Sequence, residues 1–256
     1  MVLRQLGRTG LAVSPVALGT TKLGRNTDVK YPVNFALPAD QEVDVLLESA
    51  RQLGVNLIDT APAYGESERR LGPFVENRRD EIVLCTKCGE QHLNGRSVYD
   101  FSAPAILASV EESLRRLRAD HLDILLLHSA GHDVDILTQT DAVDALSRLK
   151  QSGKIRAAGI SAKTTAGILE ASRTLDVIMA PFSQKEPSLA EALAMVHGRG
   201  LGVLAIKGLF SGHLEAGPAI EFVLRQPFID ALVVGTIDAA HLAEAVAMAE
   251  RVRGAS

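Results

Sequence analysis

The stretch VNLIDTAPAYG, residues 55–65, ends a short apolar run on the carboxylate Asp59 and places Tyr64 five residues later. An apolar run of this length suits a strand buried on both faces, as in a parallel sheet. Seven further runs of this kind occur along the chain, separated by helical patterns. They cover residues 16–20, 82–87, 122–128, 155–161, 177–180, 203–207 and 231–236.

Helical patterns fill the intervals between the apolar runs. Residues 40–54 repeat apolar side chains at helical spacing, and residues 102–117 begin with Ser102 as the expected N-cap and Pro104 in the first turn. Eight alternating units predict an α/β fold, the right-handed (β/α)8 or TIM barrel. A doubly wound open sheet is the structural alternative, but no GxGxxG turn follows the first strand.

The residues before the first barrel strand predict a plug. Gly7-Arg8-Thr9-Gly10 is typical of a turn between two short strands, so we expect a β-hairpin that closes the N-terminal end of the barrel. Residues 21–39 lack periodicity and are expected to form a long loop. The whole chain, residues 1–256, is expected to form one domain of this kind.

Composition narrows the class of protein. The chain has 256 residues, of which 46% are hydrophobic, and a net charge of −4, which gives no indication of a nucleic-acid or anionic-membrane partner. No apolar stretch is long enough to span a bilayer, and the N-terminus lacks the apolar region of a signal peptide, so we expect a cytoplasmic protein. Cys85 and Cys88 form a CxxC pattern, for which a redox or metal site is one interpretation. On a strand, residues three apart face opposite sides, which favours two ordinary buried thiols and no metal site.

Most of the predicted strands end on a polar side chain. The carboxyl ends of all barrel strands meet at one face, where barrel enzymes build their sites. Asp59, Lys87 and His128 end three adjacent strands, so they should converge, and Tyr64 can fold back over them. Further strands end at Ser161, Lys207 and Thr236.

This cluster of four side chains suits acid–base chemistry. A tyrosine has a pKa of about 10, and a nearby ammonium such as that of Lys87 lowers it. Asp59 would keep the lysine charged, and a neutral His128 can orient a carbonyl oxygen or relay a proton. Each residue alone has an ordinary structural role, but together they predict a general acid beside a carbonyl pocket.

The sequence resembles the aldo-keto reductase family over nearly its whole length. The stretch IDTAPAYGESERRLG is similar to the family's Asp-Thr-Ala-x-x-Tyr-Gly-x-Ser-Glu-x-x-Leu-Gly signature. Other stretches resemble the family's opening hairpin and its lysine, histidine and fifth strands. They are LGRTGLAVSPVALGT (6–20), VLCTK (83–87), LDILLLHSAG (122–131) and GKIRAAGIS (153–161).

The resemblance implies an NAD(P)H-dependent oxidoreductase that acts on a small aldehyde, ketone or sugar. Its catalytic tetrad falls on Asp59, Tyr64, Lys87 and His128. Tyr64 would protonate the carbonyl oxygen as hydride arrives from the nicotinamide, with its pKa lowered by Lys87, which is paired with Asp59. His128 would orient the carbonyl, and in oxidation a tyrosinate would act as base.

The resemblance also implies the cofactor site. Residues 204–214 are similar to a branch of the family with a Met-Lys-Pro-Leu-type segment near the pyrophosphate, where Ser211 and Gly212 would offer backbone N–H groups. Residues 233–245 match the loop around the adenosine phosphate. The implied cofactor-binding residues are Gly19, Thr20, Ser161, Lys207, Gly208, Leu209, Ser211, Gly235, Thr236, Asp238, His241 and Glu244.

Several positions depart from the family pattern. Ala162, Met179 and Ile206 stand where an Asn, a Gln and a stacking aromatic are usual. His241 replaces a common Arg, and Asp238 would repel a 2′-phosphate or bond a free ribose hydroxyl. We expect NADP as cofactor, with NAD as the alternative.

The substrate pocket is expected to be shaped by loops, because the connection 213–219 is brief and no long tail follows the last helix. Its candidate lining residues are Tyr31, Phe35, His92, Tyr99 and Phe101. The substrate would be a small-molecule carbonyl or alcohol. Two other functions stay open: a non-catalytic nucleotide-binding barrel that serves as a regulatory or scaffold subunit, and a lyase or isomerase with Lys87 as Schiff base. The complete tetrad argues against the first, and the placement of Tyr64 argues against the second.

Overall fold

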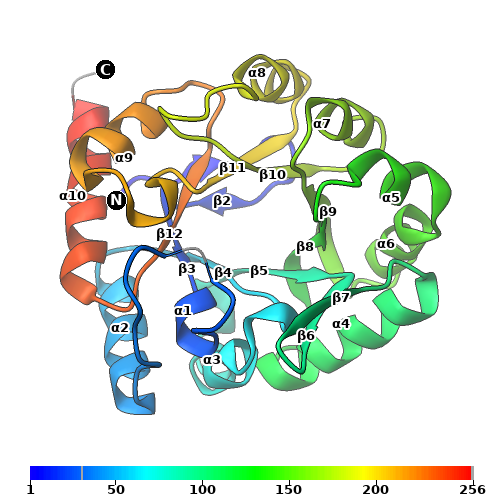
Figure 1. Cartoon of the computed structure of the whole chain (residues 1–256), viewed down its shortest axis with the longest axis horizontal. Helices are drawn as coiled ribbons and strands as arrows, with labels where there is room; N and C mark the ends of the chain where they lie inside the picture. Colours follow the sequence, from blue (N-terminus) through cyan, green and yellow to red (C-terminus); the bar gives the residue numbers. More distant parts are fainter. Residues whose placement is uncertain (30, 255–256) are drawn as a thin grey trace.

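The computed structural model describes residues 1–29 and 31–254, and in this part of the chain eight parallel strands close into a barrel surrounded by helices (Figure 1). The last barrel strand pairs back onto the first, so the sheet has no open edge. The strands are β3 (Val16–Gly19), β4 (Leu57–Asp59), β5 (Val83–Cys88), β8 (Leu122–His128), β9 (Ile155–Ser161), β10 (Val177–Pro181), β11 (Gly202–Ile206) and β12 (Ala231–Gly235). The predicted (β/α)8 barrel is confirmed, with each strand on one of the eight apolar runs.

A ring of helices covers the outside of the barrel (Figure 1). The helices are α2 (Asp40–Gln52), α3 (Ser67–Glu76), α4 (Ala103–Leu117), α6 (Ala142–Gln151), α7 (Thr165–Ala171), α8 (Ala190–Gly198), α9 (Ala216–Leu224) and α10 (Ala239–Gly254). Two shorter helices, α1 (Thr21–Gly24) and α5 (Asp133–Gln139), lie on βα loops, so the expected loop after residue 20 begins with a helical turn. Single 3-10 turns cover Pro62–Tyr64, Arg79–Glu81 and Phe210–Gly212. Ser102 stands at the N-cap of α4 as predicted, but its side chain makes no capping hydrogen bond.

Side chains alternate between the inside of the barrel and the layer beneath the helices. Leu57, Cys85 and Ile124 belong to the cluster that fills the barrel, whereas Ile58 and Cys88 pack in the outer layer. The two thiols therefore face opposite sides of β5, as predicted, and both are free and buried. The same parity decides which strand-end side chains point into the mouth of the barrel.

The predicted hairpin closes the N-terminal end of the barrel. Its strands β1 (Arg4–Gln5) and β2 (Ala12–Val13) pair antiparallel, and Leu6 is fully buried in the interior cluster. Gly7 lies against the backbone at the start of β11, where a β-carbon would come within 2.3 Å of the Gly202 nitrogen. The predicted plug is confirmed.

A second hairpin, which the sequence reasoning missed, follows β5 directly. Its strands β6 (Glu90–Leu93) and β7 (Arg96–Tyr99) pair antiparallel around Asn94 and Gly95, both with positive φ (52° and 77°). Asn-Gly is the commonest sequence for such a two-residue turn, so the signal for this hairpin was present in the sequence. β6 packs against the 3-10 turn Pro62–Tyr64, which brings the hairpin to the rim of the mouth.

Candidate active site

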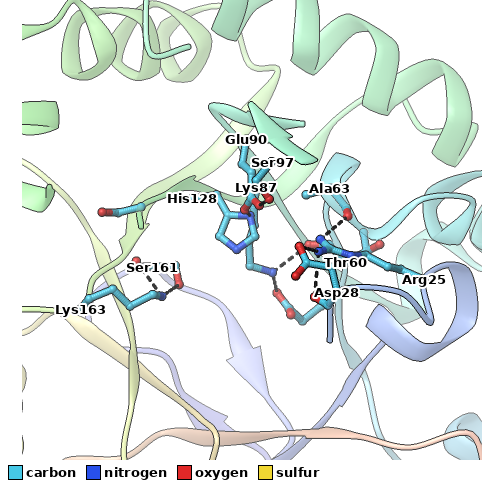
Figure 2. Close-up of polar contacts among 12 residues, drawn as sticks. Arg25, Asp28, Thr60, Ala63, Lys87, Glu90, Ser97, His128, Ser161 and Lys163 are labelled. Atoms are coloured by element: carbon cyan, nitrogen blue, oxygen red, sulfur yellow. Dashed lines mark hydrogen bonds and ion pairs between the residues drawn. The ribbon is translucent and has the colours of Figure 1, made fainter. Parts of the chain in front are cut away.

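A buried ion pair forms the floor of the mouth. Lys87 and Asp59 end adjacent strands, with Lys87 Nζ 2.5 Å from Asp59 Oδ1, and the ammonium also donates to the Thr60 carbonyl (2.9 Å; Figure 2). Burial would lower the pKa of Lys87, but the charge of Asp59, together with the effects of Tyr64 and Cys85, holds that pKa above its usual value. Lys87 is therefore a fixed positive charge.

Tyr64 folds back over this pair, as predicted. It ends the 3-10 turn after β4, with the Lys87 ammonium 4.8 Å from its ring centre. The ring of His128 stands nearly perpendicular to it, with centroids 6.0 Å apart. All four residues of the expected tetrad thus lie together at the carboxyl end of the barrel.

The pKa of Tyr64 differs from the sequence expectation. Burial raises it above its ordinary value, while Lys87 and a hydrogen bond with Thr21 act in the opposite direction. The expected net lowering is therefore wrong for the protein alone, because loss of solvent outweighs the charge of Lys87. Tyr64 holds its proton at neutral pH.

His128 has a carboxylate partner that the sequence analysis did not identify. Glu90 Oε2, on β6, lies 2.7 Å from His128 Nδ1, and Glu90 Oε1 accepts a 2.6 Å hydrogen bond from the Ser97 hydroxyl on β7 (Figure 2). Burial would raise the pKa of Glu90, but these contacts hold it to about 2. Burial lowers the pKa of His128, so the imidazole is neutral at neutral pH beside an ionised carboxylate.

Two of the expected cofactor-binding residues, Gly19 and Gly235, provide a surface without side chains. Gly19 and Gly235 are paired across β3 and β12 at the mouth, and Gly235 is exposed. The Tyr31 hydroxyl lies 3.4 Å from where a β-carbon on Gly235 would stand. Bare backbone of this kind admits a flat ring close to the strands. Thr20, in contrast, is fully buried and its hydroxyl donates to the Asp59 carbonyl, so it supports β4 and does not line the mouth.

The turn after β11 has the strain that is common at ligand sites. Lys207, Phe210 and Ser211 have positive φ values of 61°, 49° and 59°, which cost free energy in residues other than glycine. The turn also contains Gly208 and Leu209, as the expected pyrophosphate segment does. The Gly212 N–H donates to the Leu209 carbonyl (2.9 Å), so it is not directed at a ligand as expected.

The loop after β12 has an acidic character. Asp238 and His241 are both exposed and form a 3.7 Å contact, while the Asp238 carboxylate accepts the Ala240 N–H (2.7 Å). The Thr236 hydroxyl accepts the Asp238 N–H and so shapes this loop, and Glu244 is exposed on α10. This loop therefore offers no arginine to a 2′-phosphate.

The expected lining residues of the pocket separate into two groups. Tyr31 and Phe35 contact each other edge to face, with the Lys22 ammonium over both rings, on the loop beside the mouth. His92 instead lines a cavity of about 830 Å³ between α3 and α4, outside the barrel. Tyr99 stacks on Phe101, which packs against Gly89 at the start of the second hairpin.

One face of the mouth fits a nicotinamide dinucleotide. It contains the bare surface of Gly19 and Gly235, the strained turn after β11 and Ser161. Such a mouth, at the carboxyl end of a closed (β/α)8 barrel, defines an NAD(P)-dependent oxidoreductase. The model of the Aldo/keto reductase family matches residues 15–217, and the chain belongs to this family. None of the helices in the described residues is long and apolar enough to cross a membrane.

Known proteins similar to this chain include enzymes and a solved structure. A putative aldo-keto reductase structure from Pseudomonas aeruginosa is 45% identical, with a TM-score of 0.90 over 98% of this chain and 95% of that one. L-galactose dehydrogenase from Arabidopsis thaliana is 34% identical, over 84% of this chain and 68% of that protein. NADH-specific methylglyoxal reductase from Escherichia coli is 31% identical, over 85% of this chain and 70% of that protein.

Proposed function

We propose that this chain transfers hydride between NAD(P)H and the carbonyl carbon of a small aldehyde, ketone or sugar, with Tyr64 as general acid and base. The observation that carries the proposal is the convergence of Asp59, Tyr64, Lys87 and His128 at the mouth of the barrel. The names of two similar proteins, a galactose dehydrogenase and a methylglyoxal reductase, support a small sugar or aldehyde as substrate.

Proton transfer in this proposal depends on Tyr64 and Lys87. A bound nicotinamide supplies hydride in reduction and accepts it in oxidation. Tyr64, which is protonated at neutral pH, donates its proton to the carbonyl oxygen, and the fixed charge of Lys87 stabilises the tyrosinate that forms. Asp59 keeps that charge in place. Oxidation needs the tyrosinate first, so we expect oxidation to speed up as the pH rises.

We propose NADP as the cofactor, with NAD also accepted. The resemblance to the family favours NADP. The acidic loop favours NAD, because Asp238 repels a 2′-phosphate and His241 is a weaker partner for it than an arginine. One similar protein is named as NADH-specific, which supports a measurable activity with NADH.

The test of the proposal is the Tyr64→Phe variant. We expect kcat for methylglyoxal reduction to fall by about 10²- to 10⁴-fold, as for loss of a general acid, because only the hydroxyl is removed. The dissociation constant of NADPH, measured by fluorescence titration, should change by less than about 3-fold. Turnover near the wild-type rate in this variant contradicts the assignment of Tyr64.

A wild-type protein that binds nucleotide but reduces no carbonyl would instead favour the non-catalytic barrel. The panel of substrates should therefore include a sugar lactol, an aliphatic aldehyde and an aromatic aldehyde. Each is assayed in both directions with NADPH, NADH and their oxidised forms.

A further inference from the structure

A second lysine reaches the mouth of the barrel beside the proposed catalytic residues. Lys163 lies on the loop between β9 and α7, and its partly buried side chain extends toward the side of the mouth that holds Ser161 and His128 (Figure 2). Its ammonium donates to the Ser161 hydroxyl (2.9 Å) and to the Ser161 carbonyl (3.2 Å). Both acceptors are neutral.

The carboxylates near Lys163 contact other groups and form no ion pair with its ammonium. Asp133, on α5, accepts the backbone N–H groups of Lys163 and Thr164 (2.9 and 2.8 Å) on one oxygen. Glu90 contacts His128 and Ser97. Among residues 1–29 and 31–254, no carboxylate forms an ion pair with the Lys163 ammonium.

Charges of both signs face the Lys163 ammonium. Lys207, after β11, and Lys87, on β5, repel the ammonium, while Asp133 and Glu90 attract it from a distance. Lys163 in turn disfavours protonation of His128. Burial of a cation without a paired anion is unfavourable, and a ligand that brings the anion removes that cost.

We propose that Lys163 forms a subsite for the carboxylate of the substrate, so that the preferred substrates are carbonyl compounds that carry a carboxylate. The ammonium has three N–H donors, of which two go to Ser161, so the third is left for an oxygen of a substrate carboxylate. The inference rests on the proposed function, because it assigns a substrate class to that same site.

The test compares each acid with its own methyl ester. Wild-type protein is assayed with 4-oxobutanoate, with 4-formylbenzoate and with the methyl ester of each acid. Each ester keeps the carbonyl group of its acid but lacks the negative charge. We expect kcat/KM to be about 10- to 100-fold higher for the acids, the range for hydrogen bonds to a charged group. In Lys163→Met this ratio should fall to within about 3-fold of one, with the rates on the esters unchanged.

Two further variants separate charge at the subsite from other effects. Lys163→Arg keeps the charge and should keep the preference for acids. Lys154→Met, at the opposite end of β9, removes the same net charge from an ion pair with Glu111 and should leave the preference intact. Burial lowers the pKa of Lys163 to about 8, so KM for the acids should rise above that pH in wild type but not in Lys163→Arg.

Other outcomes overturn the inference in distinguishable ways. Equal rates for acids and esters in wild type, with Tyr64→Phe inactive, would leave the proposed function intact and remove the carboxylate subsite. A Lys163→Met variant that loses NADPH affinity and slows on all substrates alike would place Lys163 at the cofactor carboxamide instead. Wild-type protein inactive on acids and esters alike would overturn the proposed function itself.

Discussion

Glu90 decides which nitrogen of His128 carries the proton. An ionised carboxylate 2.7 Å from Nδ1 selects the neutral tautomer with hydrogen on Nδ1. Nε2 then has a lone pair and accepts a hydrogen bond from a hydroxyl, such as that of an alcohol substrate. To donate to a carbonyl oxygen, the imidazole must first be protonated. The expectation that a neutral His128 orients a carbonyl therefore holds only for the other tautomer.

The Glu90→Gln variant tests this positioning role. Glu90 raises the pKa of His128 against the effect of burial, so its removal should move the basic limb of kcat/KM for reduction, where His128 loses its proton, to lower pH. We expect a shift of about one pH unit and a loss of about 10-fold at neutral pH. The measurement is the pH profile together with the NMR titration of His128.

Ser97→Ala is the matched control, because it removes the hydrogen bond from Ser97 to Glu90 but keeps the charge of Glu90. Its profile should stay close to that of wild type. If Glu90→Gln leaves both the profile and the histidine titration unchanged, Glu90 has only a structural role.

At the scale of single residues, the sequence predicts the position of a side chain well where the alternation of a strand fixes the side to which it points. Asp59, Lys87, His128 and Ser161 end strands that are buried on both faces, so their meeting at the mouth follows from the barrel alone. Glu90 and Lys163 lie on a hairpin and a loop, whose course depends on turn geometry and tertiary packing. Their roles therefore needed the structure, even though Asn94-Gly95 indicated a turn.

The hairpin plug is an element whose stability contribution can be isolated. Gly7 and Gly10 both have positive φ, but only Gly7 lies so close to another strand that an added β-carbon would stand 2.3 Å from the Gly202 nitrogen. Gly10→Ala should cost about 1 kcal/mol, for the left-handed backbone alone. Gly7→Ala adds a clash with backbone that cannot rotate away, and should cost about 3 kcal/mol or more. Urea unfolding measures both.

Equal losses in the two variants would mean that the plug is free to move away from β11. The two variants can be compared directly, because both substitutions add the same methyl group in the same turn. A β-carbon on Gly10 meets no atom within 4 Å, so any excess loss at Gly7 comes from packing.

Helices and strands could be predicted from the sequence where their side chains are extensively buried. The barrel strands and long helices follow from apolar runs and helical spacing. The second hairpin was missed because it lies on the rim, where Leu93, Val98 and Tyr99 are exposed and no buried face dictates a pattern. The expected cofactor contact of the Gly212 N–H was wrong, because that N–H donates within its own turn, to the Leu209 carbonyl, which the sequence does not specify.

At the scale of the whole molecule, cofactor binding should stabilise the barrel. The proposed site joins β3, β12 and the turn after β11, so a nucleotide binds the folded state and not the unfolded chain. At 100 times its dissociation constant, NADPH should add about 2.7 kcal/mol. For a chain of this size, that raises Tm by about 5–10 °C.

The same thermal measurement reports cofactor choice. In Asp238→Asn the shift with NADPH, at a fixed concentration, should grow relative to that with NADH, because a charge facing the 2′-phosphate is removed. Tyr64→Phe is the control and should shift as wild type does. No shift with either nucleotide would contradict the proposed cofactor site.

The pairing of Gly19 with Gly235 joins the first barrel strand to the last. The bare surface proposed for the nicotinamide therefore exists only once β12 has paired with β3, since each strand supplies one of the two glycines. Contacts between such distant segments carry the largest loop-closure entropy and form late in folding. Nucleotide affinity therefore reports closure of the barrel. A protein that binds the nucleotide has paired β12 with β3, and a folding intermediate without that pairing should not bind it.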